Sequence, residues 1–122
     1  MTRDAFADLA SDALASLPPE VHAWLENVQV VVEDRPTRAQ IRETGVPCGE
    51  TLLGLYEGTP RTDRTSDYGL VLPDKVTLFR APILDLCDTE TEVAREVRRT
   101  VLHELAHHFG IDDDRLDALG AY

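Results

Sequence analysis

Residues 100–113 constrain the fold of this chain more than any other part of its sequence. They read Thr-Val-Leu-His-Glu-Leu-Ala-His-His-Phe-Gly-Ile-Asp-Asp, in which His103, Glu104 and His107 form the pattern H-E-x-x-H. On a helix, side chains four residues apart lie on one face with Cβ atoms about 5 to 6 Å apart, so two imidazoles can reach one small cation. The stretch is therefore expected to be a helix that holds a zinc ion through His103 and His107.

Glu104 is placed to act on water beside such an ion. It follows His103 by one residue, which turns its side chain about 100° around the helix axis, beside the metal and not at it. Zinc lowers the pKa of its water towards about 7, and a neighbouring carboxylate can take the proton. Glu104 is therefore the predicted general base.

A catalytic zinc ion usually takes three protein ligands, so a third must come from outside the histidine pair. Gly110, three residues after His107, suits a helix C-terminus in the left-handed conformation, which turns the chain back towards the metal. Asp113 follows this turn and is the predicted third ligand, with Asp114 and Asp117 as alternatives. In the metzincin pattern H-E-x-x-H-x-x-G-x-x-H, which the stretch resembles, a histidine stands at the position of Asp113.

The same residues have other interpretations. Residues 112–114 are all aspartates, which can instead cap a last short helix ending near Leu119, since carboxylates are favoured at helix N-termini. His108 lies about 100° from His107, towards the apolar side, and is expected to be a packed or hydrogen-bonded structural histidine. Two histidines with one carboxylate also suit non-haem iron, although H-E-x-x-H on a helix favours zinc.

Length and charge narrow the class of protein. With 122 residues, the chain (1–122) is expected to form a single domain. Its formal net charge of −11, from 23 acidic and 12 basic residues, argues against nucleic acid and anionic membrane surfaces as partners. No apolar run approaches the roughly 20 residues of a membrane span, and residues 1–6 lack a signal-peptide core, so a cytoplasmic location is expected. Cys48 and Cys87 form no C-x-x-C pair and are expected to be buried reduced thiols.

Apolar periodicity and capping residues predict the helices of the first half. The apolar spacing over residues 4–17 indicates an amphipathic helix, and Pro19 can open a second short helix. Thr37 and Gln40 form a capping box for a further short helix, which Gly45 ends.

Strands are expected at three places, and a long helix comes after them. Residues 27–33 are rich in valine, residues 51–56 alternate, and residues 75–80 alternate again, so each reads as a strand. Thr89 with Glu92 then makes a capping box for the long helix that carries the histidines.

The long helix separates its apolar side from its histidines. Its core-facing residues are expected to be Ala94, Val97, Val101, Leu105 and Phe109. The residues His103, His107, Glu96 and Thr100 lie roughly opposite. A lone core histidine would sit within the apolar arc, whereas a pair across from it must face solvent, another layer or a metal.

Residues 57–69 show no apolar periodicity and are expected to be a mobile loop. The loop is either a simple connector or a lid over the site. Tyr68, near its end, is a candidate donor to a developing oxyanion.

Beyond the histidine stretch, the chain resembles a family of small bacterial zincin-like metallopeptidases over nearly its whole length. The runs that carry this resemblance are residues 53–58 (Leu-Gly-Leu-Tyr-Glu-Gly), 72–80 (Leu-Pro-Asp-Lys-Val-Thr-Leu-Phe-Arg) and 101–111. The resemblance implies an α+β, minimal zincin-like fold, in which a small sheet of three or four strands packs against helices that include the H-E-x-x-H helix. It also implies a zinc-dependent peptidase, without naming a substrate.

The chain departs from larger zincins in the segment after Asp113. Few residues remain there, so a methionine turn and the C-terminal subdomain that shapes a substrate pocket are not expected, and the sole methionine is Met1. A peptide would have only the third strand and the loop to hold it. In zincins the strand before the active-site helix is often an edge that pairs with an extended peptide, and residues 75–80 are expected to be that edge.

Three functions therefore compete. The first is a zinc-dependent metallopeptidase of narrow specificity that acts on a peptide or protein. The second is another zinc-dependent hydrolase, resembling the small endonucleases of ribosomal-RNA maturation, against which the charge of −11 argues. The third is a non-catalytic, metal-binding scaffold for a partner peptide. The substrate and the oligomeric state are left open.

Overall fold

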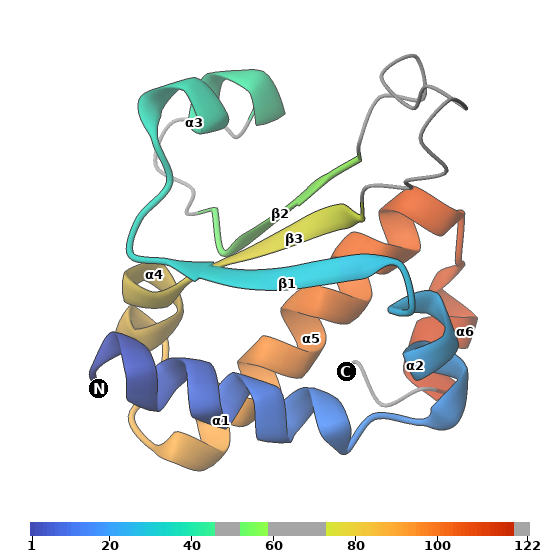
Figure 1. Ribbon diagram of the computed structural model, residues 1–122, viewed down its shortest axis with the longest axis horizontal. Coiled ribbons are helices and arrows are strands. Elements are labelled where there is room, and N and C mark those ends of the chain that lie inside the picture. Colours follow the sequence, from blue (N-terminus) through green and yellow to red (C-terminus); the bar gives the residue numbers. More distant parts are fainter. Residues whose placement is uncertain (46–51, 59–72, 119–122) are drawn as a thin grey trace.

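The computed structural model describes residues 1–45, 52–58 and 73–118 of the chain. In these residues, six helices and three strands follow one another along the sequence (Figure 1). They are α1 (Arg3–Ala15), α2 (Pro19–Trp24), β1 (Val28–Glu33), α3 (Arg38–Thr44), β2 (Gly54–Glu57), β3 (Asp74–Phe79), α4 (Arg80–Asp85), α5 (Glu90–Phe109) and α6 (Asp113–Ala118). Cys48, Tyr68 and most of the loop expected at 57–69 lie outside the described residues.

The three strands form one mixed sheet in the order β1-β3-β2. β1 runs parallel to β3, with Val30 opposite Val76, and β2 runs antiparallel to β3, with Tyr56 opposite Val76. Helices α1 and α5 cover one face of the sheet, and α3 lies on the other side (Figure 1). The α+β architecture with a small three-stranded sheet, predicted from the sequence, is confirmed in the described residues.

The expectation that residues 75–80 form an edge strand is wrong. β3 is the central strand, paired on both sides, and β2 is the edge that runs antiparallel to its neighbour. The burial of β3 explains its place, because Val76, Thr77, Leu78 and Phe79 are all fully buried. A strand buried on both faces belongs in the middle of a sheet.

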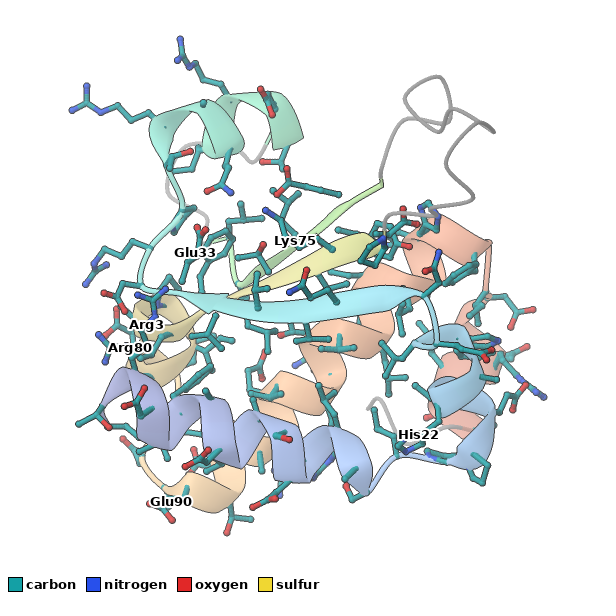
Figure 2. All side chains as sticks on the ribbon, in the orientation of Figure 1. Arg3, His22, Glu33, Lys75, Arg80 and Glu90 are labelled. Atoms are coloured by element: carbon teal, nitrogen blue, oxygen red, sulfur yellow. The ribbon has the colours of Figure 1, made fainter. Side chains whose placement is uncertain are left out.

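α1 is tied to the core and to the end of the sheet. Thr2 caps its N-terminus by accepting a hydrogen bond from the Ala5 N–H. Its buried face packs on α5 and consists of Phe6, Ala10 and Ala13. Arg3 donates to the Val32 carbonyl, and Arg80 donates both to Asp34 and to the Met1 carbonyl. Figure 2 shows the two arginines at the same end of the sheet.

The capping signals in the sequence set the helix ends. Thr37 and Gln40 make the reciprocal capping box at α3, which ends at Gly45 with a φ of 68°. Half of the capping box predicted at α5 is present, because the Thr89 hydroxyl accepts a hydrogen bond from the Glu92 N–H. The Glu92 carboxylate accepts from the Asp88 N–H and not from the Thr89 N–H of the predicted box.

The core face of α5 differs from the predicted arc at both of its edges. The buried residues of α5 are Val93, Val97, Thr100, Val101, Leu102, Leu105 and Ala106. Phe109, predicted to be core, is 46% exposed, because the helix emerges from the core in its last turn. Thr100, expected on the opposite side, is buried against the edge strand β2. None of the helices in the described part of the chain combines the length and apolarity that a bilayer crossing requires.

Candidate metal centre

The second half of α5 carries His103, Glu104 and His107 on a continuous helix, as the sequence predicts. The helix ends at Gly110, which has the left-handed φ of 70° and ψ of 33° that favour glycine. The N–H groups of Gly110 and Ile111 both donate to the Ala106 carbonyl, which closes the last turn. The chain therefore reverses directly after the histidines, just before the predicted third ligand.

Glu104 is held by two neighbours. Its Oε1 atom accepts a hydrogen bond of 3.1 Å from the Tyr56 N–H, and its Oε2 atom lies 3.8 Å from His107 Nδ1. The side chain is only 20% exposed. Burial raises the pKa of the Glu104 carboxyl, while the hydrogen bond from Tyr56 and the nearby His107 act in the opposite direction. The result is a partly desolvated carboxylate of fixed direction, which suits a general base.

The two histidines lie in different surroundings. The Nε2 atom of His103 is buried, whereas the His107 side chain is 80% exposed. His103 is therefore the more buried of the two histidines, and His107 lies at the surface. Imidazole nitrogens of this kind are ligands that zinc takes, so the donor chemistry of the pair fits the ion.

The third ligand stays a prediction. In the part of the chain that the structure describes, no group of three or more His, Cys, Asp or Glu side chains is arranged to hold a metal ion. Asp113 begins α6 directly after the Gly110 turn, but its side chain lies outside the described residues. Asp112 caps α6, because its Oδ1 accepts from the Arg115 N–H at 2.9 Å. The alternatives Asp114 and Asp117 are exposed.

Tyr56 connects the edge strand to the end of α5. Its hydroxyl donates to Asp74 Oδ2 at 2.6 Å, and its ring stacks on His108 with centroids 4.0 Å apart. His108 Nε2 lies 3.7 Å from the same Asp74 oxygen, and Phe109 meets both rings edge-on. His108 thus packs on the Tyr56 ring, as expected for a structural histidine, but its side chain is 41% exposed and does not lie on the apolar side. These contacts fix the backbone amide that holds Glu104.

Gly54 lets the edge strand approach the helix closely. A Cβ atom at this position would lie 2.5 Å from the Thr100 Cγ2 atom and 3.2 Å from the Thr77 carbonyl oxygen. Any larger residue would require the Thr100 side chain or the strand to shift. Sequence reasoning does not assign Gly54, Tyr56 or Asp74 to the site, although a glycine inside a strand is a recognised sign of close backbone approach.

Two clefts meet along β2 at Glu104. One, of about 400 Å³, lies on the side of His103 and reaches Leu86 and Glu96. The other, of about 420 Å³, lies on the side of His107 and His108. Both are lined by Leu52, Gly54 and Glu104. The carboxylate therefore lies between two adjoining hollows that together follow the edge of the sheet.

Comparison with known proteins gives one family and one fold. Residues 25–121 match the family described as zincin-like metallopeptidase. A solved structure of a conserved hypothetical protein from Thermo thermophilus superposes with a TM-score of 0.58 at 22% sequence identity, covering 89% of this chain and 94% of that chain. At this identity the likeness shows the fold alone. Among curated proteins, none matches the chain.

Proposed function

The chain belongs to the zincin-like metallopeptidase family, and from this membership we propose that it is a zinc-dependent peptidase of narrow specificity. In this proposal His103, His107 and Asp113 hold the zinc ion, and Glu104 is the general base. The observation that carries it is the Glu104 carboxylate, held by the Tyr56 amide beside His107 at the junction of two clefts.

In this reaction the ion would supply Lewis acidity, and residues of the chain would carry out the proton transfers. A zinc ion supplies Lewis acidity, which polarises the scissile carbonyl and makes water a stronger acid. Glu104 accepts the proton of the attacking water through Oε2, the oxygen directed to His107, while the Tyr56 N–H holds Oε1. The same carboxyl then returns the proton to the departing amine. Partial burial of Glu104 suits both steps, because it brings the pKa of the carboxyl closer to neutral.

The edge strand that would hold a peptide is β2. The Phe79 N–H donates to the Leu53 carbonyl, which marks these two residues as a hydrogen-bonded pair of the antiparallel ladder. Hydrogen-bonded and non-hydrogen-bonded pairs alternate along an antiparallel ladder. Leu55 and Glu57 therefore direct their backbone N–H and C=O groups to β3, and Gly54 and Tyr56 direct theirs to the open edge. The bond from the Tyr56 N–H to Glu104 agrees with this direction. An extended peptide added at β2 would therefore lie directly beside the general base.

A peptide-binding scaffold without catalysis is the second candidate, and one observation favours it. Glu104 already accepts a hydrogen bond from the edge strand, so the carboxylate has a structural use that requires no reaction. A nuclease is disfavoured by the net charge of −11, since phosphate backbones are bound by basic surfaces.

The decisive experiment replaces Glu104→Gln in the zinc-loaded protein. The amide keeps the size of the side chain but cannot act as a base, so hydrolysis should fall by about 10² to 10⁴ while zinc stays bound. Extended, basic peptides are the first substrates to test because the surface is acidic. The matched control is Glu90→Gln, the same change at the exposed start of the same helix, which should leave the rate unchanged (Figure 2).

Three other outcomes would decide between the candidates. Equal inactivity of the wild type and the Glu104→Gln variant across a broad peptide library, with zinc bound in both, would replace the peptidase by the scaffold. Cleavage of RNA by the wild type that is lost in His103→Ala would establish the nuclease. A Glu104→Gln variant as active as the wild type would remove Glu104 from its role.

A further inference from the structure

Helix α3 is almost uncovered. It has no buried residue, and every one of its residues except Gln40 is exposed. Among the described elements, it packs extensively against none. Isolated helices shorter than about 12 residues are marginal in water, and α3 has seven residues. A contact that covers α3 would therefore stabilise it.

The exposed surface of α3 is basic, although the chain as a whole is acidic. Arg38, Ile41 and Arg42 are three or four residues apart and so lie on one side of the helix, which we call the basic face. Residues 35–44 contain three arginines and one glutamate, whereas the net charge of the chain is −11. Arg38 begins the helix, where the positive end of the helix dipole disfavours a cation. Its charge therefore does not serve the stability of α3 itself.

On the other side of the sheet, a groove of about 560 Å³ lies between α1 and the first half of α5 (Figure 1). Its apolar lining includes Leu9 and Ala94, both of which are partly exposed. Asp8 and Asp12 line it as well and are exposed. The acidic residues of the groove outnumber its single arginine, Arg98. The groove thus offers an apolar surface beside negative charge.

The aspartates of the groove match the arginines of α3 in their spacing. Asp8 and Asp12 lie four residues apart on α1. Arg38 and Arg42 have the same spacing on α3, so in each pair the Cβ atoms are about 5 to 6 Å apart. Two helices placed side by side can therefore bring both arginines against both aspartates. None of the four side chains forms an ion pair with another described residue.

We propose that α3 of one copy of the chain docks into the groove between α1 and α5 of a second copy. Its arginines pair with Asp8 and Asp12, and Ile41 covers the apolar part of the groove. Because the two surfaces lie on opposite sides of the sheet, the contact joins unlike surfaces and leaves one α3 and one groove free in each pair (Figure 1). The inference is independent of the proposed peptidase, although Thr44 at the end of α3 lines the cleft on the His107 side.

The first test measures self-association of the full-length protein. The contact is small and each copy carries a net charge of −11, so it is expected to be weak. Sedimentation velocity over a concentration series should give a dissociation constant on the order of 10⁻⁴ M. In NMR spectra, the amide signals of Leu9 and Ile41 should shift together as the concentration rises, because the contact covers both surfaces.

Two double variants block the two surfaces separately. Arg38→Glu with Arg42→Glu reverses the charge of the basic face, and Asp8→Asn with Asp12→Asn removes two charges from the groove. Each should weaken self-association about tenfold or more. A mixture of the two should form a heterodimer with the wild-type affinity, because the first variant keeps an intact groove and the second keeps an intact α3. Association in the mixture also shows that both variants are folded.

The matched control is Arg95→Glu with Arg99→Glu, the same changes at the same spacing on α5. Both arginines are exposed, and neither lines the groove, so this variant should associate like the wild type. A wild type that stays monomeric throughout the concentration series would overturn the contact. Self-association that persists in both double variants, or a mixture that does not associate, would overturn it as well. Equal loss in the control would assign the effect to net charge and would also overturn the contact.

Discussion

α5 has a buried face along most of its length, as far as Ala106, and becomes exposed in its last turn. In the first part of the helix, Val93, Val97 and Val101 are buried against α1 and the sheet. In the last turns, His107 is 80% exposed and Phe109 is 46% exposed. The helix thus begins as a core element and ends as a surface element, and the H-E-x-x-H segment lies across the change.

This difference separates the part of the helix that sets the fold from the part that completes the site. His103 lies in the part of the helix whose other face is buried. His108 contacts residues of two other elements, the Tyr56 ring of β2 and Asp74 of β3, whereas His107 lies beside the Glu104 carboxylate of its own helix. Stability should therefore respond most to changes on the buried face of the helix, from Val93 to Ala106, and the geometry of the site to changes at β2.

The largest expected effect tests the comparison directly. Leu102→Ala, at a fully buried position, should lower the free energy of unfolding by about 2 to 5 kcal/mol through lost burial and an unfilled cavity. Phe109→Ala should lower it by about 1 kcal/mol or less, although it removes a larger side chain, because that side chain is 46% exposed. Urea unfolding monitored by circular dichroism measures both, and equal losses would contradict the division of the helix.

A smaller effect is expected where β2 meets the helix. Gly54→Ala should destabilise the protein by about 1 to 3 kcal/mol, because the added Cβ would lie 2.5 Å from Thr100 Cγ2. Thr100→Ser removes that methyl group, so the double variant should recover part of the loss. A double-mutant cycle of unfolding free energies measures this recovery. Additive losses would show that the two residues do not meet.

The smallest effect concerns the contact between Tyr56 and Asp74. Tyr56→Phe keeps the ring on His108 but removes a hydroxyl that donates to a carboxylate at 2.6 Å, so the unfolding free energy should fall by about 1 to 2 kcal/mol. The Tyr56 amide should also exchange with solvent faster, because the strand that presents it to Glu104 is less firmly held. Hydrogen exchange tests the second point, and unchanged exchange would mean that the hydroxyl does not position the strand.

Most helices can be predicted because their signals are local. Five capping residues begin or end helices in the structure through contacts within a few residues of each position. They are Thr2, Thr37, Gly45, Thr89 and Gly110. Such contacts depend on the nearby sequence alone. The apolar pattern wrongly predicts a buried Phe109, because periodicity cannot show where a helix leaves the core.

The order of the strands cannot be predicted in the same way. Analogy predicts residues 75–80 at an edge, but β3 is central because its pairing partners lie far away in the sequence, in β1 and β2. The alternating pattern predicts the second strand over 51–56, and β2 is Gly54–Glu57. A strand boundary depends on its partner, which the local pattern does not contain.

The residues of the site also divide into those that the local sequence predicts and those that it does not. His103, Glu104 and His107 can be placed together from their spacing on one helix. The Tyr56 amide that holds Glu104 cannot, because it is a backbone group 48 residues away and any residue type except proline supplies it. Asp113 stays a prediction as the third ligand, since only its place at the start of α6 is described.

The most direct test of the site is the zinc content of the purified protein and of three alanine variants, measured by mass spectrometry under native conditions. The wild type should hold about one zinc ion per chain, His103→Ala should lose it, and Asp113→Ala should hold it more weakly than the wild type but better than His103→Ala. The control His22→Ala, at an exposed histidine of α2, should keep the full amount. Zinc that stays bound in His103→Ala would contradict the metal centre, and unchanged affinity in Asp113→Ala would contradict its third ligand.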